Sequence, residues 1–104
     1  MGPMTTEVTD NPSASRFEMT VDGELVGHLD YREHEGEYAI PYTRIYPQFE
    51  GHGHGSELVV RSLEAIRDRQ GTVLPYCPFV PKVIRENPEL VELVPESERA
   101  SFGL

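Results

Sequence analysis

The stretch FEGHGHGSELV, residues 49–59, places three glycines at alternate positions directly before an apolar pattern of helical period. Gly51, Gly53 and Gly55 carry no Cβ atoms, so an anion can approach the main chain closely. The first N–H groups of a helix have no partner inside it, and the helix dipole adds positive potential there. The stretch therefore favours a strand-to-helix junction that holds a phosphate without a basic side chain.

Two common phosphate-binding motifs do not fit this loop. A P-loop needs a lysine after its last glycine, whereas Ser56 follows Gly55 here. The Rossmann motif is G-x-G-x-x-G, but the glycines here run G-x-G-x-G. A turn that only reverses the chain explains three glycines as well as an anion site does. A metal site on His52 and His54 is a weaker alternative, because no cysteine is near and the acids are remote.

Periodic patterns after the loop predict the second half of an α/β domain. Apolar residues recur with helical spacing from His54 to Gln70, which predicts the main helix. TVLPY, residues 72–76, is typical of a short buried strand, and Lys82 to Glu86 favours a short helix. ELVELV, residues 89–94, fits either a last strand or packed coil.

Alternation before the loop predicts an antiparallel meander of three strands. Asp22-Gly23 is a strong signal for a two-residue hairpin turn between the first two. Pro41 cannot donate to a strand ladder, and the apolar parity changes beyond it, so we expect a bulge in the third strand. The residues expected to line the apolar faces are Phe17, Met19 and Val21, then Leu25, Gly27, Leu29 and Tyr31, then Tyr38, Ile40 and Tyr42.

Length and composition favour one soluble domain. The chain has 104 residues, and we expect a flexible arm over 1–14, a folded domain over 15–94 and a tail over 95–104. The formal net charge of -9 disfavours nucleic-acid binding and would attract a cationic amine, although solubility alone explains it. No signal peptide or membrane span is visible, and the single cysteine suits the cytoplasm. The sequence leaves the oligomeric state open.

The order of these elements and two motifs resembles the GNAT superfamily of acyl-CoA-dependent N-acetyltransferases, in particular its compact single-domain branch. Phe49 to Ser56 is similar to the Phe-Arg-Gly-x-Gly-x-Gly-Ser loop of that branch. YCPFV, residues 76–80, and Asn87-Pro88 are similar to its Cys-Pro-Phe-like turn and its Asn/His-Pro helix stop. The resemblance covers roughly Ser15 to Val94.

The resemblance implies a GNAT-like fold, with the three-strand meander joined to a parallel strand pair, a main helix after the glycine loop and a short helix. It also implies that acetyl-CoA is bound, with its diphosphate on the backbone amides of His52 to Ser56 and its pantetheine arm along the third strand toward Cys77. The binding residues expected on this basis are Tyr42, Thr43, Ile45, Gly51, His52, Gly53, His54, Gly55, Ser56 and Cys77.

Three positions depart from the compact branch. Glu50 replaces a Gln or Arg, and Arg44 stands where the branch carries Glu, which suggests either a charge-swapped pair or two unrelated solvated charges. Tyr42 stands at a His position, so a base there is lost or replaced. Protonated His52 or His54 would add positive charge at the diphosphate, unless both imidazoles face solvent.

Cys77 and Tyr42 are the candidate catalytic residues. Cys77 would be a nucleophile or a small buried hydrophobe, and direct transfer is the commoner mechanism in the superfamily. The phenols of Tyr42, Tyr46 and Tyr76 are candidates to protonate the leaving thiolate. His28 and His34 are expected to face solvent. The expected function is N-acetyl transfer to a small amine or a protein lysine, and the alternative is an acyl-CoA-binding module with little or no turnover.

Overall fold

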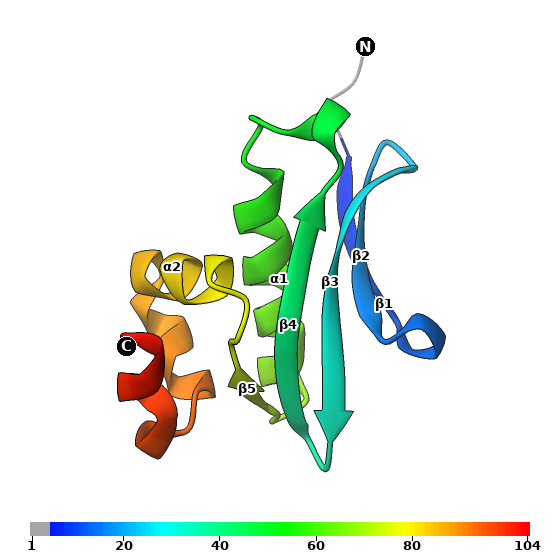
Figure 1. The fold of residues 1–104 in the computed structure, drawn as a ribbon. Coiled ribbons are helices and arrows are strands. Elements are labelled where there is room, and N and C mark those ends of the chain that lie inside the picture. Colours follow the sequence, from blue (N-terminus) through cyan, green and yellow to red (C-terminus); the bar gives the residue numbers. More distant parts are fainter. Residues whose placement is uncertain (1–4) are drawn as a thin grey trace.

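Alternating apolar residues put one face of a five-stranded sheet against a helix (Figure 1). The computed structural model describes residues 5–104. The strand order is β1-β2-β3-β4-β5, with the first four antiparallel and β5 parallel to β4. The strands are β1 Thr6–Asn11, β2 Arg16–Val21, β3 Glu24–His34, β4 Glu37–Ile45 and β5 Thr72–Leu74. The predicted α/β class, with a meander joined to a parallel pair, is confirmed.

Two α-helices follow the meander. Helix α1, His54–Asp68, connects β4 to β5, and helix α2, Phe79–Glu86, follows β5. Figure 1 shows α2 and the C-terminal segment beside the β5 end of the sheet, away from β1. No helix among the described residues is long and apolar enough to span a bilayer.

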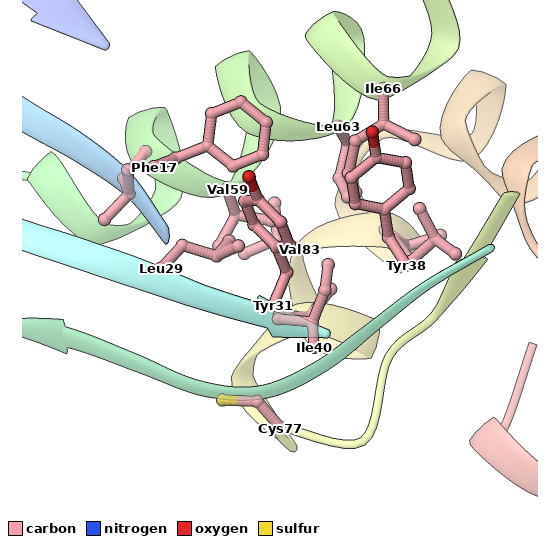
Figure 2. Close-up of a cluster of buried hydrophobic side chains, with 14 of the residues drawn as sticks. Phe17, Leu29, Tyr31, Tyr38, Ile40, Val59, Leu63, Ile66, Cys77 and Val83 are labelled. Atoms are coloured by element: carbon pink, nitrogen blue, oxygen red, sulfur yellow. The ribbon is translucent and has the colours of Figure 1, made fainter. Parts of the chain in front are cut away.

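The core lies between the sheet and α1. Figure 2 shows Phe17, Leu29 and Ile40 of the sheet facing Val59, Leu63 and Ile66 of α1. All six side chains are buried. Each such side chain contributes about 1.5–3 kcal/mol to folding by leaving water. This packing fixes α1 on one face and leaves the opposite face of the sheet to polar residues.

The expectation of a flexible arm over residues 1–14 is wrong for its described part, whereas residues 1–4 lie outside the described residues. Thr6–Asn11 forms β1, which pairs with β2 along its whole length, so the meander has one strand more than predicted. The Asp10 carboxylate accepts a hydrogen bond from the Tyr31 hydroxyl at 2.7 Å and pairs with Arg69 at 2.9 Å. These contacts tie β1 to β3 and to the end of α1. Burial, followed by the bond to Asp10, raises the pKa of Tyr31, so its hydroxyl stays a donor.

The bulge predicted at Pro41 is present. Asp30 pairs with Tyr42 and Arg32 with Ala39, so Tyr31 alone lies opposite two residues of β4, Ile40 and Pro41. The extra residue reverses the facing of everything after it. Tyr42 is therefore 44% exposed on the face opposite α1, and the prediction that it shares the Tyr38 and Ile40 face is wrong.

The second half of the chain follows the predicted order with different boundaries. β5 stops at Leu74 rather than Tyr76, and α2 begins at Phe79 rather than Lys82. Residues 89–94 do not form a strand but lie mostly in a 3-10 helix, Pro88–Leu93, packed through Leu90 and Leu93. The tail contains another 3-10 helix, Glu96–Phe102.

Candidate functional site

The parallel pair of strands separates halfway along β4. β5 pairs only with Glu37, Tyr38 and Ala39. Beyond that point the Cys77 amide donates to the Ile40 carbonyl at 2.8 Å, and the chain then leaves toward α2. Within residues 5–104, no strand pairs with this edge of β4 over 41–45. The backbone groups along this free edge are available to an extended ligand that hydrogen-bonds like a strand.

The glycine loop lies at the C-terminal end of this free edge. β4 leads through a 3-10 helix, Pro47–Phe49, into the loop, and α1 begins at His54. Gly53 has φ +78°, which a glycine adopts without strain, and a Cβ there would meet nothing within 4 Å. No side chain caps α1, and its first backbone bond runs from the Glu57 amide to the Gly53 carbonyl at 3.3 Å. The amides that precede Glu57 therefore have no partner inside the helix.

Three elements meet at the start of α1. A Cβ added to Gly55 would lie 3.2 Å from the Phe79 ring of α2 and 3.6 Å from Cγ1 of Ile45 in β4. The Lys82 ammonium lies over the same Phe79 ring, 5.9 Å from its centroid. Lys82 and Gly55 thus contact the same Phe79 ring, and the glycine loop itself contains no lysine or arginine. The sequence pattern did not single out Lys82, because the proximity arises from the packing of α2 on α1.

Tyr42, Thr43 and Ile45 lie on the free part of β4, and Cys77 lies beside it. Figure 2 shows Cys77 in the loop after β5, next to β4, with its sulfur directed along that strand. The Cys77 side chain is buried, with 8% of the residue exposed. The Thr43 hydroxyl is also buried and has no hydrogen-bond partner among the described residues. An orphaned hydroxyl beside an unpaired strand edge indicates that a polar group completes this region.

The two loop histidines lie beside the β2–β3 hairpin. His54 is buried, and the His52 and His54 rings lie 5.7 Å apart. Both line a cavity of about 320 Å³ on the side of the β2–β3 hairpin, together with Asp22 and Glu24. Those carboxylates disfavour an anion in that cavity. No group of three potential metal ligands occurs within residues 5–104.

The hypothesis of a charge-swapped pair between Arg44 and Glu50 is wrong. The Arg44 guanidinium lies over the Tyr46 ring, 5.6 Å from its centroid, and no ion pair joins it to Glu50 in the described part of the chain. Arg44 projects from the outer face of β4, where it is in register with His28. Glu50 instead follows the 3-10 helix, beyond the end of that strand.

The expectation that His28 faces solvent is also wrong. Only 12% of its side chain is exposed, and its Nδ1 lies 2.7 Å from Oδ1 of Asp30. The rings of Tyr42 and Tyr46 lie 6.1 Å and 6.0 Å from its own. His34, in contrast, is exposed at the end of β3.

Comparison with known proteins supports the resemblance seen in the sequence. A search of curated proteins finds no matching relative. A family model described as GCN5-related N-acetyl-transferase matches residues 16–93, which is well over half of the chain. This range includes the separated strands, the glycine loop, both α-helices and Cys77. The chain therefore belongs to the GCN5-related N-acetyltransferase family.

Proposed function

We propose that this chain transfers an acetyl group from acetyl-CoA to a primary amine, either a small molecule or a lysine side chain. The observation that carries the proposal is the free edge of β4, which ends at the uncapped start of α1. An extended acyl-pantetheine arm with a diphosphate at one end has the shape and the hydrogen-bonding groups for such a site. Because the one cysteine is free, we place the reaction in the reducing cytoplasm.

The residues present fit acetyl-CoA. The backbone amides of His52 to Ser56 would hold the diphosphate through the unpaired N–H groups and the helix dipole. Lys82 would add a positive charge next to them. The backbone of β4 from Tyr42 to Ile45 would bind the amides of the pantetheine arm, and the Thr43 hydroxyl would gain the partner it lacks.

The chemistry needs a deprotonated amine, a polarised thioester carbonyl and a proton for the leaving thiolate. Backbone N–H groups on the free edge of β4 supply the polarisation. Tyr42, directly after the bulge, supplies the phenol that protonates the sulfur. Acetyl-CoA brings the activated acetyl group, and the protein positions it and moves the protons.

A covalent route through Cys77 is a second candidate, favoured by the position of its sulfur beside β4. In that route the thiolate of Cys77 attacks the acetyl carbon, CoA leaves as the thiol, and the amine then takes the acetyl group from the cysteine. We favour direct transfer, because the thiol is buried and packed against the sheet.

One experiment separates these possibilities. Wild type and Cys77→Ala are mixed with acetyl-CoA, with and without the amines putrescine, spermidine and Nα-acetyl-lysine amide. Free thiol and intact protein mass are then measured, and binding of acetyl-CoA is measured by calorimetry. Direct transfer gives amine-dependent thiol from both proteins and no added acetyl mass. The covalent route is supported if wild type carries an acetyl adduct, whereas Cys77→Ala carries none and is inactive. Bound acetyl-CoA without any thiol release identifies a binding module, the alternative that the replacement of His by Tyr42 favours.

A further inference from the structure

The outer face of the sheet, opposite α1, contains two rows of polar side chains in register across three strands. Glu18, His28 and Arg44 form one row over β2, β3 and β4. Arg16, Asp30 and Tyr42 form the next. Neither row takes part in the core or in the predicted site for acetyl-CoA, except through Tyr42.

His28 is held in one orientation within these rows. Its Nδ1 lies 2.7 Å from Oδ1 of Asp30, and the Tyr42 and Tyr46 rings enclose it so that only 12% of the side chain is exposed. A carboxylate is acceptor-only, so the neutral imidazole donates its Nδ1 proton to Asp30. Its Nε2 is then left as a proton acceptor, which is the arrangement that activates a histidine base.

The other charged side chains that face His28 have partners of their own. Glu18 faces His28 from β2, but it already accepts from Arg16 Nε at 2.8 Å and from the Asn11 amide at 3.2 Å. These two bonds, that to Arg16 first, lower the pKa of Glu18, so it stays an anion balanced by Arg16. Arg44 faces His28 from β4 but lies over the Tyr46 ring.

A cavity lies between Asp30 and the bulge, and His28 borders it only through its partner Asp30. It has a volume of about 580 Å³, and its lining includes Arg16, Asp30, Arg32, Glu33 and Pro41. Asp30 is the partner of His28, and Pro41 is the bulge residue that precedes Tyr42. The carboxylates of Asp30 and Glu33 can accept hydrogen bonds from an alkylammonium group, and Arg16 and Arg32 balance their charge. Its size suits a small amine or the end of a lysine side chain.

We propose that His28, held by Asp30, accepts the proton that the acceptor amine loses. The inference rests on the proposed function and names the general base for it. The ammonium gives one proton to Nε2 of His28, and the neutral nitrogen then bonds to the acetyl carbon. The carbon–sulfur bond breaks, the second nitrogen proton passes to the sulfur through the Tyr42 phenol, and His28 releases its proton to solvent.

The test compares wild type with His28→Asn and Asp30→Asn. His34→Asn serves as the matched control, because this second histidine of β3 is exposed. Turnover of putrescine, spermidine and Nα-acetyl-lysine amide is measured from about pH 6 to about pH 9. Acetyl-CoA affinity is measured by calorimetry. Ring ¹⁵N shifts of His28 are recorded in wild type, with and without the amine alone.

We expect His28→Asn to lower kcat about 100-fold near neutral pH, the usual contribution of a general base. Asp30→Asn has a smaller effect, and neither variant nor the control changes acetyl-CoA affinity. Wild-type kcat levels off as pH rises, whereas that of His28→Asn keeps rising. The ring shifts place the proton on Nδ1, and they move when the amine is added.

The outcomes distinguish this inference from the function on which it rests. If wild type binds acetyl-CoA but turns over none of the amines, both the transfer reaction and the role of His28 are rejected. If wild type turns over and His28→Asn keeps its rate and its pH profile, the inference alone is rejected. A ring that carries its proton on Nε2 also rejects it.

Discussion

Tyr42→Phe is expected to lower kcat about 100-fold while acetyl-CoA affinity stays unchanged, because the substitution removes only a proton donor. The phenyl ring keeps the contact with His28, whose ring lies 6.1 Å from that of Tyr42. Tyr42 is also part of β4, whose main chain would bind the pantetheine arm whichever side chain is present. Steady-state thiol release and calorimetry give the two values separately.

Tyr76→Phe is the matched control for this substitution. Tyr76 is the other well-exposed tyrosine, at 59%, and its ring packs against Phe102 rather than against β4. Removal of the Tyr76 hydroxyl should leave both kcat and acetyl-CoA affinity unchanged. Equal rates for Tyr42→Phe and wild type would show that the thiolate takes its proton from another group.

Gly53→Ala is expected to weaken acetyl-CoA binding about 30-fold, or about 2 kcal/mol, the value of a hydrogen bond to a charged group. At φ +78° an alanine is strained by about 1–2 kcal/mol, and relief of that strain turns the loop amides away from a shared anion. Calorimetry with acetyl-CoA measures the affinity, and urea unfolding measures the stability of the same variant.

Gly36→Ala separates strain from binding. Gly36 has φ +84°, and a Cβ there also meets nothing within 4 Å, but it lies in the β3–β4 turn at the other end of β4. The two variants should lose similar stability, and only Gly53→Ala should lose affinity. A similar loss of affinity in both would attribute the effect to general destabilisation.

Local signals in the sequence were sufficient to predict much of the fold. The Asp22-Gly23 turn, the glycine loop and the helical period after it depend on neighbouring residues, and the structure has all three. The bulge at Pro41 was also predictable, because proline and the change of parity occur together. β1 was missed because its stability comes from distant partners, Tyr31 and Arg69, which bond to Asp10.

The roles of His28 and Lys82 at the site were not predicted for the same reason. His28 occupies a polar position of an alternating strand, which predicts exposure. It is covered because the bulge turns Tyr42 onto its face, where Tyr46 also packs. Lys82 approaches the loop only through the packing of Phe79 near Gly55. Both effects depend on contacts between elements. The apolar periodicity of a single helix or strand does not reveal such contacts.

The central claim is that the uncapped start of α1 and the free edge of β4 together bind acetyl-CoA. A titration of ¹⁵N-labelled protein with acetyl-CoA, followed through the backbone amide signals, tests it most directly. The account predicts the largest changes at His52 to Ser56 and at Tyr42 to Ile45, with little change in β1. Signals that stay unmoved at the glycine loop, or that move only in the β2–β3 hairpin at Asp22 and Glu24, would contradict it.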